Sequence, residues 1–183
     1  MIVRDSSRTR RSGMVVAIIL ALLQLSVVPY LGIAGGRANL ALVLTAFLAL
    51  GGDAGRATIA GFFAGLFYDL AGTGPIGLMA LLLTILGFLM SSAERPGVAD
   101  DPVSSLVLFV PASLAVGLVY GFILLATGQA SSLFDTVVLR ALPGSLLDCL
   151  WFAAISLIAA RLQGPRGTMG ASRKGGHYSM RGL

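Results

Sequence analysis

Long apolar segments without charged side chains are the feature that most restricts how this chain can fold. Residues 14–34 form the first of them, with 21 residues and no charge. As a helix rising about 1.5 Å per residue, such a segment covers the hydrocarbon core of a bilayer, which is about 30 Å thick. Only 11% of the residues are charged, against roughly a quarter in soluble domains. The sequence therefore predicts an all-α integral membrane protein.

A basic stretch precedes this first segment, as it does in secretory signal peptides. The apolar run is longer than the roughly 7–15 residues typical of a signal peptide, and further apolar segments follow at once. We therefore expect residues 14–34 to be an uncleaved membrane anchor.

Six apolar segments are expected to form one transmembrane helix bundle. The second segment has only 14 residues, which is short for a span, so it must be tilted or extended. Residues 131–141 mix apolar side chains with Asp135 and Arg140 and are expected to be an interfacial loop or a short helix. The six segments are residues 14–34, 38–51, 57–71, 76–92, 103–127 and 142–162.

The basic residues predict which side of the membrane each connection faces. An even number of spans places both tails, residues 1–13 and 163–183, on the same side. Of the 13 basic residues, only Arg37 and Arg140 fall in connections on the opposite side. Because cytoplasmic connections carry an excess of Lys and Arg, both tails are expected in the cytoplasm, flanking a transmembrane domain of residues 14–162. The other eleven are Arg4, Arg8, Arg10, Arg11, Arg56, Arg95, Arg161, Arg166, Arg173, Lys174 and Arg181.

The net charge of +5 raises the question of nucleic-acid binding. The basic residues are concentrated in the two tails, where anionic lipid head groups explain them more simply. We therefore expect contact with anionic lipids and no nucleic-acid partner. The C-terminal tail, residues 163–183, is expected to be disordered on its own.

Small residues and one aspartate recur along the third segment. Ala57, Gly61, Gly65 and Asp69 are spaced by four, and each such step turns only about 40° around a helix, so they form one stripe. Small residues let a second helix approach closely. Asp69 then either faces a packed interface, accepting hydrogen bonds from partner groups or from the Gly-Thr-Gly turn at 72–74, or caps the helix end in head-group water. The spacing alone leaves both interpretations open.

A second stripe with the same spacing lies in the fifth segment, at Ser113, Gly117 and Gly121. Patterns of small residues four apart are common in membrane helices, so we favour packing within the chain over oligomerisation.

Three further polar residues fall in or beside apolar segments: Gln24, Asn39 and Asp148. They could converge as a polar cluster in the outer half of the bundle. Intramembrane ionisable groups can mark a transport path, but two separated aspartates without an intramembrane Arg, Lys or His make a poor relay. Polar links between helices are therefore the favoured interpretation.

Catalytic groupings are missing from the sequence. The single histidine, His177, lies in the tail, and the single cysteine, Cys149, lies in an apolar run. No Ser-His-Asp or Cys-His set, paired carboxylates, zinc-ligand cluster or phosphate-binding loop can be assembled. We expect a protein that is not an enzyme and that needs no cofactor or metal.

The order of residues in 38–92 resembles the MreD family, the small membrane subunit of the bacterial rod-shape machinery. The family pattern runs through leucines, a Gly-rich link, Gly-Phe-x-x-Gly-Leu-x-x-Asp-Leu and a Gly-containing turn before Gly-x-x-Ala-Leu. Ala38 stands where the family usually has proline. The matching positions are Asn39-Leu40, Gly61-Phe62, Gly65-Leu66, Asp69-Leu70, Gly77 and Ala80-Leu81, with Pro143 and Leu147-Asp148 in the last segment.

The resemblance implies a non-catalytic component of the elongation machinery in the cytoplasmic membrane. Its partners would be an MreC-like protein, the RodA glycosyltransferase, a class B penicillin-binding transpeptidase and, indirectly, MreB filaments. It also implies a six-helix bundle similar to the substrate-binding S subunits of energy-coupling-factor vitamin transporters. The candidate helix-packing or interface residues are Asn39, Gly61, Gly65, Asp69, Gly77, Gly117, Gly121 and Asp148.

That structural similarity supplies an alternative function, a substrate-binding subunit of a vitamin-uptake transporter. Size, six apolar segments and polar residues towards the outside favour it. The short connections, the Gly-Thr-Gly-Pro turn above all, leave little chain to build a lid over a ligand, so the role in cell shape is preferred.

Overall fold

The structure, a computed structural model, describes residues 18–32, 35–51, 53–92 and 101–163. Within these ranges every regular element is a helix, which confirms the predicted all-α class. The basic N-terminal tail, the start of the first apolar segment and nearly all of the C-terminal tail lie outside the described residues.

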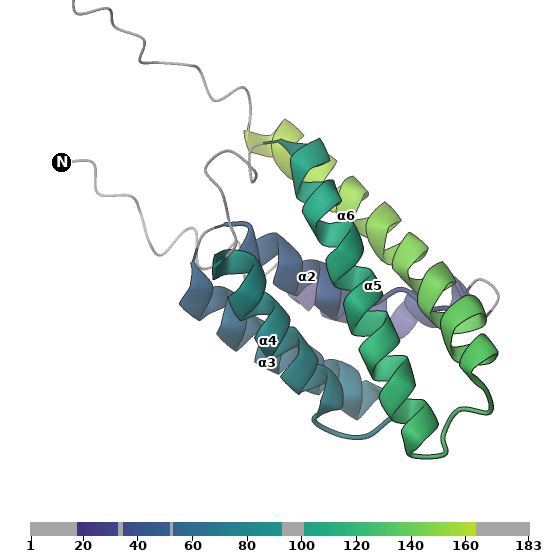
Figure 1. Ribbon diagram of the computed structural model, residues 1–183. Helices are drawn as coiled ribbons and strands as arrows, with labels where there is room; N and C mark the ends of the chain where they lie inside the picture. Colours follow the sequence, from purple (N-terminus) through teal and green to yellow (C-terminus); the bar gives the residue numbers. More distant parts are fainter. Residues whose placement is uncertain (1–17, 33–34, 52, 93–100, 164–183) are drawn as a thin grey trace, which may run out of the picture.

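Each predicted apolar segment contains a helix (Figure 1). Residues 18–26 are helical and lead into a short 3-10 helix, η1 (Val28–Tyr30). The longer elements are α2 (Leu40–Ala49), α3 (Ala54–Ala71), α4 (Leu78–Ser92), α5 (Pro102–Ala126), the π-helix η2 (Asp135–Ala141) and α6 (Leu142–Gln163).

Exposed aspartates set the starts of two helices. Asp53 accepts the N–H of Arg56 at the start of α3, and an ion pair of 2.9 Å joins the two side chains. Before α5, Asp101 accepts the Ser104 hydroxyl and the N–H groups of Ser104 and Val103. The hydrogen bond from the Ser104 side chain, and then the two backbone bonds, lower the pKa of Asp101 below its ordinary value. Aspartate is favoured at such N-cap positions because it satisfies these backbone donors.

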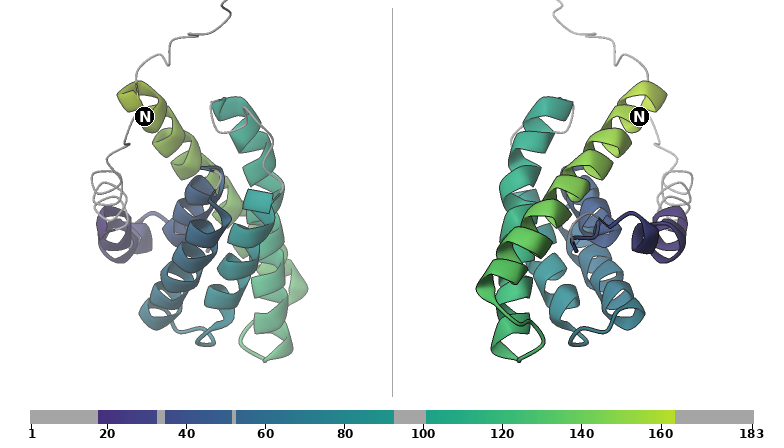
Figure 2. Two further views of the ribbon diagram at one scale, coloured as in Figure 1. Left: turned by 90° about the vertical axis from the view of Figure 1, so that its left-hand side faces the viewer. Right: turned by 90° about the vertical axis from the view of Figure 1, so that its right-hand side faces the viewer.

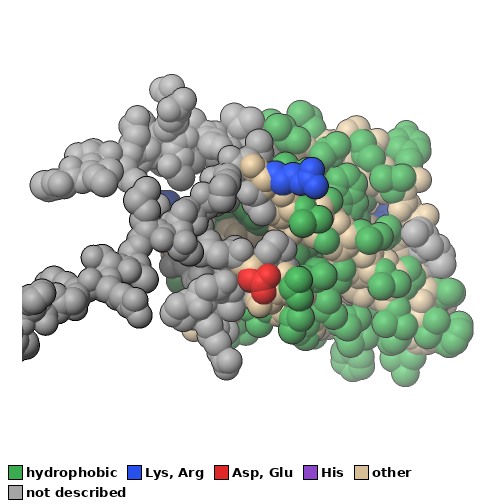
Figure 3. Space-filling model, turned by 90° about the horizontal axis from the view of Figure 1, so that it is seen from above, with side chains coloured by type: hydrophobic (Ala, Val, Ile, Leu, Met, Phe, Trp, Pro, Cys, Tyr) green, Lys and Arg blue, Asp and Glu red, His purple; other side chains and the backbone are tan. Residues whose placement is uncertain are grey.

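Two helices in the described residues are long and apolar enough to cross a membrane. They cover Val103–Ala126 in α5 and Asp135–Ala159, which joins η2 to α6. Large apolar side chains such as Phe122 and Leu146 are exposed on them, and hydrophobic side chains cover most of the described surface in Figure 3. Extensive exposed apolar surface is typical of contact with membrane or protein partners. The arrangement of six spans stays a prediction.

Helix α2 is shorter than the predicted second span. It has 10 residues, which at about 1.5 Å each give a length of about 15 Å, half the hydrocarbon core. Asn39 caps its start, and nearly all of its residues are buried. Helix α2 is therefore a half-length helix enclosed by the others, and a crossing by residues 38–51 would need the non-helical residues that flank it.

The region predicted as an interfacial loop or short helix is instead continuous with the last helix. Residues 133–134 are helical, η2 follows with π geometry, and α6 continues without a break. Pro143 therefore lies inside a long helix rather than at its start. The Leu142 N–H bonds the Val137 carbonyl five residues earlier, so the wider π turns directly precede the proline, which has no N–H of its own to donate.

Helices α3 and α4 are the most extensively packed pair. A Cβ atom on Gly65 would lie 2.6 Å from the Ala80 Cα and from the Met79 carbonyl oxygen. A Cβ on Gly87 of α4 would lie 2.7 Å from the Ala57 carbonyl oxygen. The two backbones are therefore in direct contact. The buried residues of α3 are the predicted stripe, Ala57, Gly61, Gly65 and Asp69.

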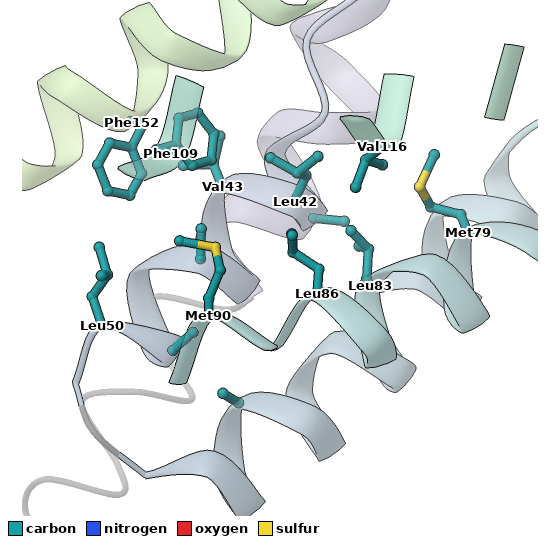
Figure 4. Packing of buried hydrophobic residues seen from close by; sticks show 14 residues of the cluster. Leu42, Val43, Leu50, Met79, Leu83, Leu86, Met90, Phe109, Val116 and Phe152 are labelled. Carbon is teal, nitrogen blue, oxygen red and sulfur yellow. The ribbon is translucent and has the colours of Figure 1, made fainter. Parts of the chain in front are cut away.

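The core surrounds α2. Figure 4 shows side chains of α4, α5 and α6 gathered around Leu42 and Val43 of α2. The rings of Phe109 on α5 and Phe152 on α6 are fully buried and stack with their centroids 4.3 Å apart. Aromatic stacking of this kind fastens α5 to α6 beside the half-length helix.

The connections fall at two ends of the molecule. The α3–α4 turn and the connection from α5 to η2 lie at the same end, which we call the turn end (Figure 2). The start of α5 and the end of α6 lie at the opposite end. The turn end therefore carries the first residues of α4.

Replacing Gly65 by Ala is expected to destabilise the protein, because the added methyl group would have to displace the backbone of α4. Overpacking of this kind typically costs about 1–3 kcal/mol. The matched control is Gly55→Ala in the same helix, where a Cβ would lie 3.6 Å from the nearest atom, an Asp53 carboxylate oxygen. Thermal unfolding in detergent should show a lower midpoint for Gly65→Ala alone, and equal midpoints for this variant and the wild type would contradict the close packing.

Candidate functional site at two buried helix N-termini

Asp69 is a buried carboxylate near the end of α3. The residue is only 2% exposed. Its Oδ2 accepts the N–H groups of Gly77 at 2.9 Å and Ala80 at 3.1 Å, and its Oδ1 accepts the N–H of Met79 at 3.2 Å. These donors belong to the first turn of α4, where backbone N–H groups have no partner within their own helix. Asp69 therefore caps the neighbouring helix.

This geometry separates the two interpretations of Asp69 that the spacing left open. A cap in head-group water does not fit, because the residue is buried and its acceptors are occupied by backbone donors. The donors come from the residues after the Gly-Thr-Gly turn rather than from the turn itself. The positive end of the α4 dipole also favours a carboxylate here, which offsets part of the penalty for burying its charge.

A second capping centre lies at the start of α2. Asp148 Oδ1 accepts the backbone N–H of Asn39 in a short hydrogen bond. Gln24 Oε1 accepts the N–H of Leu40 at 2.8 Å, and Asn39 Oδ1 accepts the N–H of Leu42 at 3.1 Å. The structure thus brings together Gln24, Asn39 and Asp148, the three polar residues expected to converge.

The acceptors at this centre come from three different parts of the chain. Gln24 belongs to the helical residues 18–26, Asn39 precedes α2, and Asp148 belongs to α6. An N–H group without a partner in a hydrocarbon environment costs several kcal/mol. A half-length helix that starts inside the bundle needs such acceptors, which explains why polar residues stand in these apolar segments.

Met79 connects the two centres. Its backbone N–H donates to Asp69, and its sulfur accepts from the Asn39 side-chain amide at 3.4 Å. The other end of the network is the Gln24 amide, which donates to the Ala38 carbonyl at 3.4 Å. In the part of the chain that the structure describes, no buried side-chain nitrogen or oxygen lacks a hydrogen-bond partner.

The second stripe packs on η2 of the same chain. A Cβ on Gly121 would collide with the side chain of Thr136, whereas one on Gly117 would lie 3.6 Å from the Ala141 Cβ, an ordinary contact. Gly121 thus permits a close approach, and Gly117 leaves room for a methyl group. Ser113 is buried at the same face.

Gly77 has a different role from the packing predicted for it. A Cβ at this position would meet nothing within 4 Å, but the residue has a positive φ of 94°. Glycine adopts this conformation without steric penalty. It lets the chain turn into α4 with the Gly77 N–H directed at Asp69.

Two tyrosines that join helices carry no clear sequence signal. Tyr68 and Tyr120 lie edge to face with their ring centroids 6.5 Å apart, joining α3 to α5. Each stands in an apolar run where an aromatic residue is ordinary. Gly87 could have been found, because it lies seven residues after Ala80 and therefore on the same face of α4.

The arrangement locks helices together. No group of three or more His, Cys, Asp or Glu side chains that could hold a metal ion occurs among the residues the structure describes. Both oxygens of Asp69 are engaged by backbone donors, and one oxygen of Asp148 is. These carboxylates fix where α2 and α4 begin.

Comparison with known protein families gives a match. The model of a protein family described as "MreD: rod shape-determining protein MreD" matches residues 9–162. No curated protein and no solved structure matches the chain.

Removing the Asp69 carboxylate is expected to destabilise the protein strongly. Asp69→Ala leaves three N–H groups without their acceptor, those of Met79 and Ala80 buried and that of Gly77 partly buried. Each unsatisfied buried group costs about 1–3 kcal/mol. Asp53→Ala is the matched control, because Asp53 also caps a helix but its side chain is 49% exposed, and losing an ordinary cap costs about 1 kcal/mol. In mixed detergent micelles, the unfolding midpoint of Asp69→Ala should be well below that of Asp53→Ala. Equal losses would mean that water or another group replaces the carboxylate.

Proposed function

This chain belongs to the MreD family of rod shape-determining proteins, and from that premise we propose that it links an MreC-like protein to the peptidoglycan synthases during lateral wall growth. The family match gives a membrane protein with a role in rod-shape determination. The finer role is that of a non-catalytic scaffold. Its partners would be the MreC-like protein, RodA and a class B penicillin-binding transpeptidase, with MreB filaments reached indirectly.

The family match over residues 9–162 is the observation that carries this proposal. The hydrogen-bonded starts of α2 and α4 support it, because a scaffold must present a fixed surface to its partners. The transporter alternative has no support from the comparisons with known proteins.

The proposed topology places both tails in the cytoplasm and the turn end outside the cytoplasmic membrane. Arg37 and Arg140, the two basic residues predicted to lie outside, stand beside residues of the turn end in one cavity lining. Arg56 and Arg161 belong to the basic majority expected inside, where Lys and Arg accumulate. The basic tails would contact anionic lipid head groups of the inner leaflet.

Depleting the protein from a rod-shaped host is expected to round the cells, and the wild type and Asp53→Ala should restore the rods. Asp69→Ala should not, because it disturbs the start of α4. Purification of the tagged wild type in mild detergent should recover an MreC-like protein or a wall synthase. Unchanged rods after depletion would contradict the role in cell shape, whereas rounding without recovery of either partner would contradict the linking role alone.

Cysteine labelling in intact cells should test the topology. Cys149 is the only cysteine, so Cys149→Ala gives a background for single cysteines at Thr73 in the α3–α4 turn and at Arg56. A membrane-impermeant maleimide is expected to label Thr73→Cys in whole cells and Arg56→Cys only after the membrane is opened. Labelling of Arg56→Cys in whole cells, and of Thr73→Cys only after the membrane is opened, would show that the tails face outside.

A further inference from the structure

A cavity of about 620 Å³ opens at the turn end of the bundle. Residues from the chain before α2, from the α3–α4 turn and from α5, η2 and α6 line it. Its volume falls in the range of about 300–1,000 Å³ that is common for small-molecule sites. Unoccupied cavities inside proteins are typically apolar, whereas this lining includes carboxylate, amide, phenol and guanidinium groups.

The deepest charged group in this lining is Asp148, which is only 5% exposed. Its Oδ1 accepts the Asn39 N–H, but its Oδ2 bonds to no donor among the described residues. No buried side-chain oxygen in that part of the chain is without a partner. Oδ2 must therefore be accessible, and because Asp148 lines the cavity, this oxygen opens into it.

Two phenols belong to the same cavity lining as this carboxyl group. Tyr68 and Tyr120 line the cavity, and neither hydroxyl bonds to another described residue. A Cβ on Gly74 would collide with the Tyr120 hydroxyl, so the glycine of the turn leaves space for that group. Phenol hydroxyls both donate and accept hydrogen bonds, and these two are available to a ligand.

Arg37 supplies the opposite charge. It is exposed at the cavity and forms no ion pair within the described residues. Arg140 also lines the cavity, but it pairs with Asp135 at 3.3 Å, which offsets its charge. Tyr68, Arg37 and Asp148 all belong to this one lining.

We propose that this cavity binds a zwitterionic molecule, with an ammonium group on Asp148 and a phosphate or carboxylate group on Arg37. A simple anion would meet the carboxylate, and a simple cation would meet the guanidinium. A molecule carrying both charges satisfies both groups, and charge-assisted hydrogen bonds are stronger than neutral ones. The proposal concerns ligand binding only and does not rest on the role in cell shape.

Two sources offer this chemistry, and the experiment separates them. One is the head group of phosphatidylethanolamine in the membrane, and the other is a soluble aminoalkyl phosphate. The full-length protein in detergent is titrated by calorimetry with O-phosphoethanolamine, and in parallel with phosphate alone and ethanolamine alone. Native mass spectrometry then compares retention of phosphatidylethanolamine with that of phosphatidylglycerol.

The proposal expects saturable binding of O-phosphoethanolamine at least tenfold tighter than binding of either half, or selective retention of phosphatidylethanolamine. The first result assigns a soluble ligand and the second a lipid. Arg37→Gln should weaken the observed binding at least tenfold. Arg56→Gln is the matched control, because Arg56 is an exposed arginine outside the cavity, and it should leave binding unchanged.

Variants of Tyr120 and Asp148, which line the cavity, provide a second readout. Tyr120→Phe removes only a hydroxyl and should weaken binding while the unfolding midpoint stays near that of the wild type. Asp148→Asn keeps an oxygen that can accept the Asn39 N–H and should remove the preference for the ammonium group. The proposal is overturned if phosphate alone binds as tightly as O-phosphoethanolamine without selective lipid retention. It is also overturned if neither source binds, or if Arg37→Gln and Arg56→Gln bind equally.

Discussion

A backbone N–H group inside a membrane protein must find an acceptor within the protein, because hydrocarbon supplies none. Two helices of this bundle, α2 and α4, begin where their first N–H groups are buried. Asp69 takes three of these donors at α4, and Asp148, Gln24 and Asn39 take one each at α2. Gln24, Asn39, Asp69 and Asp148 are thus accounted for by helix starts, and three of these acceptors come from other helices: residues 18–26, α3 and α6.

The glycine stripe and the Asp69 carboxylate work together. Asp69 can reach the first turn of α4 only because Gly61 and Gly65 bring the two backbones into contact. Close packing alone sets the distance between α3 and α4 but leaves them free to slide, since small residues form a smooth surface. Three directed hydrogen bonds fix the sliding position, because a shift of one turn, about 5.4 Å, would move the donors out of reach. Gly77, with its positive φ, completes the turn that makes this register possible.

The helical periodicity of the sequence predicts which faces of the helices are buried. The local backbone geometry could not be predicted from it. The four-residue spacing of Ala57, Gly61, Gly65 and Asp69 identifies the buried face of α3, because a helix repeats nearly every four residues. The convergence of Gln24, Asn39 and Asp148 also follows from the rarity of polar groups in such segments. Hydropathy cannot show that α2 stops after 10 residues or that π turns precede Pro143, because both depend on where hydrogen bonds end. The two tyrosines are likewise ordinary in apolar runs.

Asp148 shows how a structural group can also serve a ligand. A carboxylate has two oxygens, and the start of α2 engages only one of them. Its place in α6 is therefore fixed by folding, while the free oxygen faces a cavity whose opposite charge, Arg37, comes from the residues just before α2. A zwitterion held between these groups would connect the chain before α2 to α6 across the turn end. Its binding would stiffen the same end of the bundle that the two helix starts already order.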